Sequence, residues 1–214
     1  MCAVVDASTQ AALADARAAQ DRAAVQVRSL VEVAELDDAR AVFDAVWPDP
    51  RGGTQITPDL LRAMAYCGCY VAAAYDGDVP VGASYALVGR ERVDDAWHVH
   101  LHSHMAAVLV GYRDRHIGAA LKLHQRAWAL ERGIGTVVWT FDPLMRRNVR
   151  LNVLKLGVEV DGFAIDFYGS LDDGINTGDP TDRLFARWEL ASDRVARAVR
   201  DGLPPLDPAA LAAA

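Results

Sequence analysis

The chain has 214 residues, 52% of them hydrophobic, and a formal net charge of −7. This length suffices for one well-packed domain, or for one domain with an appendage. No run approaches the ~18 apolar residues of a membrane-spanning helix, and the first residues lack the pattern of a secretory signal. Without a block of lysines or arginines, nucleic acid and anionic membrane are poor candidates for a partner. An acidic surface suits a cationic substrate such as an amine.

The cysteine content indicates the compartment. Cys2, Cys67 and Cys69 are too few and too unevenly placed for a disulfide framework. We therefore expect a reduced protein in the cytoplasm, with no metal held by the Cys-Gly-Cys pair.

Residues 1–24 are rich in alanine and charged residues, with few large apolar side chains to bury. They are predicted to form an N-terminal extension, helical or frayed, outside the core. Apolar alternation predicts a strand over Val25–Val33, and helical spacing predicts a helix over Glu35–Val46. Thr57 followed by Pro58 predicts the start of a short helix that runs through Tyr66.

The middle of the chain alternates strands with one long helix. Asp-Gly-Asp at 76–78 predicts a hairpin between Tyr70–Tyr75 and Val79–Val88. The next predicted elements are a strand over Trp97–Leu109, a helix over Gly118–Arg132 that ends at Gly133, and a strand over Thr136–Phe141 that is buried on both faces.

The last third predicts a helix over Arg147–Leu156 that ends at Gly157, strands over Glu159–Tyr168 and Leu184–Leu190, and a helix over Asp193–Arg200. A Pro/Ala-rich tail over Leu203–Ala214 is expected on the surface. The order is that of an α/β protein, with antiparallel hairpins first and a strand–helix–strand unit in the middle.

The segment Val108–Lys122, VLVGYRDRHIGAALK, carries the clearest functional signal. A strand ends, a basic turn with Arg113 and Arg115 follows, and a helix opens around Gly118. Unpaired N–H groups and the helix dipole at such an N-terminus favour a phosphate or pyrophosphate. Small residues here allow the anion to approach the backbone, and the arginines add charge-assisted hydrogen bonds.

This segment resembles the Arg-x-x-Gly-x-Gly/Ala signature of the GNAT acyltransferases, with His116 in place of the first glycine. Residues 25–190 match the order of elements in that superfamily. The segments HSHMAAV, WTFDPL, RNVRLNVLKLG, FYG and PTDRLFARWEL resemble a subgroup of acetyltransferases of unassigned substrate. The resemblance implies a mixed, mostly antiparallel sheet with a splayed strand pair, into which the pantetheine arm of acetyl-CoA or another acyl-CoA enters. It divides the chain into the extension 1–24, an acyltransferase domain 25–190, and a C-terminal helix and tail 191–214.

The resemblance also implies a cofactor site. Its members are Ala106, Ala107, Val108, Arg113, Arg115, His116, Ile117, Gly118, Ala119 and Asn148. The residues of the turn hold the pyrophosphate, and the backbone around Ala106–Val108 aligns the pantetheine and polarises the thioester. A positive φ at residue 116 would strain the turn, whereas a negative φ would make histidine there inexpensive.

Histidines recur at every second residue over His98–His104, so a regular strand points them to one face. Three interpretations of this face are open. It is a polar, half-solvated surface without a special task, it holds a metal ion, or it supplies a catalytic base. The motif HSHMAAV is similar to the His-x-His strand of serotonin N-acetyltransferases. That resemblance assigns His102 and His104 to removal of a proton from the attacking amine.

The residue that protonates the leaving thiolate is less clear. The family's usual tyrosine falls on Val153, and Tyr168 is a substitute candidate, with a packing role as the alternative. Asp142 ends a central strand and is a candidate contact for the acceptor amine, or a cap for the turn at Pro143. Asn148 is a cofactor contact or a helix cap.

Together these patterns and the resemblance imply a cytoplasmic acyl-CoA-dependent N-acyltransferase acting on a small amine, without a metal, and a homodimer is compatible with them. The alternatives are a non-catalytic acyl-CoA-binding or regulatory module and a metal-dependent enzyme that uses the histidine strand.

Overall fold

A computed structural model of the chain describes residues 6–169 and 181–204. One seven-stranded sheet in the order β1-β2-β3-β4-β5-β7-β6 forms its centre. Every neighbouring pair in this sheet is antiparallel except β4 and β5, which run parallel. The strands are β1 (Gln26–Ser29), β2 (Tyr70–Asp76), β3 (Val79–Val93), β4 (Ala96–Val108), β5 (Thr136–Phe141), β6 (Glu159–Ala164) and β7 (Arg183–Glu189).

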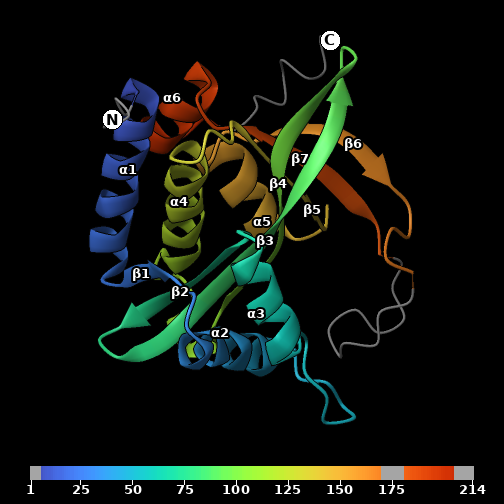
Figure 1. Cartoon of the computed structure of the whole chain (residues 1–214). Helices are drawn as coiled ribbons and strands as arrows, with labels where there is room; N and C mark the ends of the chain where they lie inside the picture. The colour runs from blue at the N-terminus through green and yellow to red at the C-terminus, as the bar shows by residue number, and fades with distance from the viewer. Residues whose placement is uncertain (1–5, 170–180, 205–214) are drawn as a thin grey trace.

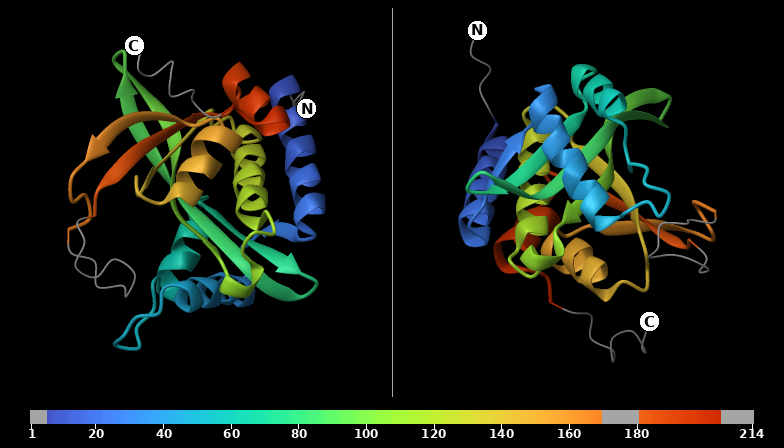
Figure 2. Two further views of the ribbon diagram at one scale, coloured as in Figure 1. Left: turned by 180° about the vertical axis from the view of Figure 1, so that it is seen from behind. Right: turned by 90° about the horizontal axis from the view of Figure 1, so that it is seen from below.

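Helices cover both faces of the sheet (Figures 1 and 2). They are α1 (Ala7–Ala23), α2 (Val33–Val46), α3 (Pro58–Tyr66), α4 (Ile117–Leu130), α5 (Arg146–Val149), a π-helical continuation of α5 (Arg150–Lys155) and α6 (Asp193–Asp201). One core lies between the sheet and α1, α4 and α6, and a second lies between the sheet and α2 and α3. None of the helices in the described part of the chain is long and apolar enough to cross a membrane. The predicted fold class is confirmed.

Helix α1 corrects the prediction for the N-terminal segment. Ala12, Ala16, Ala19 and Ala23 are buried in the first core, and α1 packs along α4. Spacings of four, three and four residues place these alanines on one stripe of the helix. Small side chains let the two helices approach closely, so the absence of large apolar residues did not mean absence from the core. The predicted position of this segment outside the core is wrong.

Other elements also differ from prediction in detail. Strand β1 ends at Ser29, and Val33, the predicted end of that strand, begins α2 instead. Strand β3 continues to Val93 because the turn to β4 falls at Asp94 and Asp95, which both adopt positive φ. Strand β6 ends at Ala164, before a turn at Asp166 with φ of 50°. Strand β5 is fully buried only on the side of Val137, whereas the opposite side is half-buried, so the expected burial of both faces is wrong. The predicted surface position of residues 205–214 lies outside the described residues.

Candidate active site

The sheet opens between β4 and β5. These strands pair only at Leu101 with Val137 and at His102 with Val138. Beyond His102, β4 continues to Val108 on β3 alone, so its backbone groups on the β5 side have no partner in that strand. The predicted splayed pair is therefore present. We call the point where pairing ends the fork.

A β-bulge in β4 lies at the fork. Tyr85 of β3 pairs with Met105 and the next residue, Ala86, pairs with Ser103, so His104 is the extra residue. A bulge re-aims side chains and is common beside active sites. The rings of His102 and His104 lie 5.8 Å apart between centroids, and the His104 ring lies 5.5 Å from that of Tyr85.

The four histidines of β4 do not form one cluster. His98 lies opposite Glu91 and His100 lies opposite Gly89, toward the β3–β4 hairpin turn. Within residues 6–169 and 181–204, no group of three or more His, Cys, Asp or Glu side chains is arranged to hold a metal ion. Ring contacts thus join His102 to His104 at the fork, whereas His100 acts on His102 only through its charge.

Tyr168, in the segment that follows β6, lies beside the same pair. Its ring centroid lies 6.5 Å from that of His104, and its hydroxyl is 2.9 Å from Thr140 Oγ1 on β5. The structure therefore brings the three predicted catalytic residues together. Sequence reasoning missed Tyr85 and Thr140, since an aromatic and a threonine inside strands carry no signal beyond strand propensity.

The surroundings of the histidine pair favour neutral imidazoles. The pKa of His102 is lowered by burial first, and then by the neighbouring His104, His100 and Lys122. Burial also lowers the pKa of His104, although the residue as a whole is exposed. A lowered pKa favours the neutral form of both rings, which is the form that accepts a proton.

The predicted phosphate site lies at the start of α4. No side chain caps this helix N-terminus, and its N-cap residue His116 has φ of 63° and ψ of 9°. The backbone at His116 is thus left-handed, a conformation that disfavours a side chain. Of the two alternatives for this residue, the positive φ that strains the turn therefore applies. A Cβ built on Gly118 meets only Leu151, at 3.9 Å, which leaves the backbone there accessible.

The two predicted arginines have different surroundings. Arg113 is exposed. The Arg115 guanidinium pairs with Asp76 at 3.0 Å, and it lies over the Tyr112 ring at 5.1 Å from the centroid. In this structure Arg115 is thus directed at the β2–β3 hairpin. Arg147 of α5, missed by sequence reasoning, pairs with Asp114 of the turn at 3.5 Å.

Two further candidates lie near the end of β5. The Asp142 carboxylate accepts a hydrogen bond of 2.7 Å from the Leu144 backbone N–H, which is the turn-capping role named as the alternative. Asn148 lies exposed on α5. Neither is placed against the histidine pair by a described contact.

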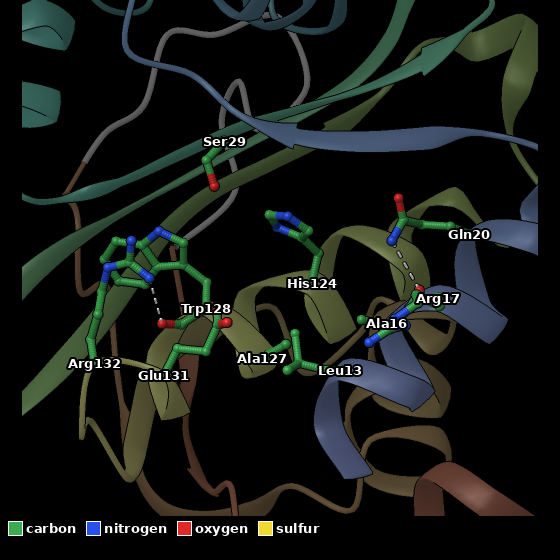
Figure 3. A pocket seen from close by; sticks show the side chains of 10 residues that line it. All are labelled: Leu13, Ala16, Arg17, Gln20, Ser29, His124, Ala127, Trp128, Glu131 and Arg132. Carbon is green, nitrogen blue, oxygen red and sulfur yellow. Dashed lines mark hydrogen bonds between the residues drawn. The ribbon is translucent and has the colours of Figure 1, made fainter. Parts of the chain in front are cut away.

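A small cavity of about 220 Å³ lies elsewhere, between α1 and α4 (Figure 3). Its lining includes Arg17, His124, Trp128 and Arg132, and it contains none of the predicted site residues. His124 Nδ1 lies 2.9 Å from the Tyr70 hydroxyl, and burial lowers the His124 pKa to about 4. We regard the fork, with its pair of histidines and its unpaired backbone on β4, as the candidate active site.

No family model and no curated protein sequence matches the chain. Solved structures do. The ribosomal-protein-S18-alanine N-acetyltransferase of Escherichia coli superposes with a TM-score of 0.60 at 15% identity, over 78% of this chain and 95% of that one. An acetyltransferase of the GNAT family from Streptococcus pneumoniae gives 0.59 at 15% identity, over 76% and 98%. The yncA protein of Salmonella typhimurium, solved with its cofactor acetyl-CoA, gives 0.60 at 18% identity, over 78% and 94%.

Proposed function

We propose that this chain, which has the fold of the GNAT acetyltransferases, is an acyl-CoA-dependent N-acyltransferase of the cytoplasm, most simply an acetyltransferase, that acts on a small amine. One observation carries the proposal: two imidazoles with lowered pKa values lie at a fork in the sheet, and the same strand leads from that fork to an uncapped helix N-terminus. The neighbour solved with acetyl-CoA supports the choice of cofactor.

The residues present fit coenzyme A. Backbone N–H groups of Ile117, Gly118 and Ala119 at the start of α4 favour the pyrophosphate, because they combine hydrogen bonds with the positive end of the helix dipole. Arg113 and His116 are exposed beside them. Arg115 joins them when it leaves Asp76, an exchange between two half-exposed partners that costs little.

The pantetheine arm follows β4 inward. Ala106, Ala107 and Val108 lie on the part of β4 that β5 does not pair with, so their backbone groups are available to hydrogen-bond an amide-containing arm. From Val108 to Ser103 an extended strand covers about 17 Å, at roughly 3.3 Å per residue. An arm that runs along this stretch places the thioester at the fork.

His102 and His104 take the proton of the amine there. A protonated amine is not a nucleophile, and a neutral imidazole within reach makes its deprotonation feasible near pH 7. The rings of Tyr85 and Tyr168 border the pair and offer an apolar wall for the carbon skeleton of the acceptor. Asn148 and Asp142 remain predicted contacts of the cofactor and the acceptor.

The proposal is tested by coenzyme A release with a panel of small amines. The double variant His102→Gln, His104→Gln should lower kcat by about 100-fold or more, since it removes the proton acceptor. It should leave the Kd for acetyl-CoA unchanged, since neither side chain belongs to the phosphate site. Unchanged turnover in the variant would overturn the assignment of the bases. Tight acetyl-CoA binding without turnover on any amine would support the binding-module alternative instead.

A further inference from the structure

A buried lysine lies directly behind the fork. The chain contains only two lysines, Lys122 and Lys155, among 22 basic residues. Lys155 is exposed, whereas the Lys122 side chain is enclosed between α4 and the sheet, with a relative exposure of 6%. Lysine and arginine differ in chemistry, because a buried lysine can lose its proton and an arginine cannot. A lysine in the core of an arginine-rich chain therefore calls for a reason.

Lys122 contacts one residue of β4 and one of β5, and each directly follows the last paired position of its strand at the fork. Its Nζ donates a hydrogen bond of 2.8 Å to Ser103 Oγ on β4, and it lies 3.8 Å from the centroid of the Trp139 ring on β5. Ser103 and Trp139 are the residues that follow the last paired positions, His102 and Val138. The ammonium group is thus held at the apex of the gap, on the sheet face opposite His102.

None of the charged and polar groups described around Lys122 is a carboxylate that pairs with its ammonium group. On its own helix, Arg126 is engaged with Asp15 and with the Leu190 carbonyl. Gln125, one turn from Lys122, is buried, and both ends of its amide lack a partner within the described residues. From β4, the His102 ring is close enough that the charge of Lys122 lowers its pKa. None of the salt bridges among residues 6–169 and 181–204 contains Lys122.

Such a position holds a proton weakly. Burial lowers the Lys122 pKa to about 7, because the charged form loses its hydration and gains no carboxylate in return. A donor with a pKa near the working pH can both give a proton and be recharged. Ser103 Oγ accepts the hydrogen bond from Lys122, so the hydroxyl proton of Ser103 is free to be donated onward.

We propose that Ser103 and Lys122, rather than Tyr168, form the proton relay that protonates the leaving sulfur of coenzyme A, in the role for which the family's usual tyrosine is absent at Val153. The inference rests on the proposed function, since it names the acid for the same reaction at the same fork.

The amine nitrogen forms a bond to the thioester carbon, and His102 or His104 takes the proton that the nitrogen releases. The carbon–sulfur bond then breaks, and its electron pair stays on the sulfur. Ser103 Oγ gives its proton to the sulfur while Lys122 Nζ gives a proton to Ser103 Oγ. Lys122 is left neutral, and solvent returns its proton after the product leaves. No oxidant, reductant or further reactant is needed.

The kinetic test uses Lys122→Met, Ser103→Ala and the matched control Lys155→Met, which removes the exposed lysine. A general acid must be protonated, so the parent kcat should fall as pH rises through the Lys122 pKa. Lys122→Met and Ser103→Ala should each lower kcat about tenfold or more at pH 7, leave the Kd for acetyl-CoA unchanged and abolish the fall at higher pH. The double variant should be no slower than the worse single one, because the two groups act as a unit. Lys155→Met should behave as the parent.

A second test does not depend on turnover. Coenzyme A and desulfo-coenzyme A differ only in the thiol, so the ratio of their Kd values reports the partner of the sulfur. The parent and Lys155→Met should bind coenzyme A about fivefold more tightly, the worth of one hydrogen bond, and the ratio should approach one in Ser103→Ala and Lys122→Met. Equal ratios in all four proteins, or an unchanged fall of kcat at high pH, would overturn the relay. If neither compound binds the parent, the proposed function itself fails.

Discussion

Replacement of Lys122 by methionine should change how stability depends on pH. Methionine has a similar length, suits an apolar interior and does not titrate. The pKa of Lys122 is about 7 in the folded protein, whereas a lysine in the unfolded chain has the ordinary value of 10.5. The two pKa values differ by about 3.5. Between these values the unfolded chain binds more protons than the folded one, so the parent gains stability as pH rises from 7 toward 10.5.

The size of the effect follows from the same difference. At about 1.36 kcal/mol per unit, the lysine costs the folded state roughly 5 kcal/mol below pH 7, and about 2–3 kcal/mol of that cost disappears between pH 7 and pH 9. The Ser103 hydroxyl, which loses its partner in the variant, adds a cost of about 1 kcal/mol that does not depend on pH. The free energy of unfolding of a folded protein is about 5–15 kcal/mol, so the folded state is compatible with the cost of a charged Lys122.

Urea unfolding at pH 6, 7, 8 and 9 measures the effect. We expect the difference in free energy of unfolding between Lys122→Met and the parent to shrink by about 2–3 kcal/mol from pH 7 to pH 9. Other groups that titrate in this range are common to both proteins and cancel in the difference. Lys155→Met, as the exposed control, should follow the parent at each pH. Parallel curves for Lys122→Met and the parent would refute the argument, because they would mean that Lys122 is as easily charged in the core as in water.

Three further predictions concern histidines. His116→Gly should be more stable to urea than His116→Ala by about 1 kcal/mol, because only glycine adopts a φ of 63° without strain; equal stabilities would show that the turn is not left-handed. His124→Gln should make stability less sensitive to acid. The pKa of His124 falls from 6.5 to about 4 on folding, so the parent loses roughly 3 kcal/mol of stability as pH drops from 6.5 to 4. Thermal melts in which the Tm of parent and variant falls equally over this pH range would contradict the prediction. In pH–rate profiles, the rise of kcat due to His102 and His104 should lie below pH 6.5, since both pKa values are lowered, and a rise centred above pH 7 would exclude them as the bases.

The sequence was informative where one local pattern determines structure. Glycines with positive φ at 77, 133 and 157 mark ends of strands or helices that were predicted close to their observed places. The alternation around His102 identified β4, and the small residues after Arg115 identified the start of α4. In each case the signal and the structure it determines lie within about ten residues of one another.

Features set by contacts between distant segments were not predictable in this way. The alanine stripe of α1 becomes a core face only because α4 packs on it, and the pairing of Arg115 with Asp76 depends on the β2–β3 hairpin. Lys122 follows the same rule. Its burial depends on where α4 lies against β4 and β5, and the one local hint was the rarity of lysine in an arginine-rich chain.

Acetyl-CoA binding to the α4 N-terminus is the most direct test of the central claim, measured by calorimetry on the parent, Gly118→Ala and Gly118→Glu. A methyl group fits at this position, so Gly118→Ala should bind as the parent does. A carboxylate in the first turn favours the helix but repels a pyrophosphate, so Gly118→Glu should remain folded and lose binding. Binding to the parent and to Gly118→Ala that is lost in Gly118→Glu would establish the cofactor site. An absence of binding to the parent, or equal binding to all three proteins, would contradict the account.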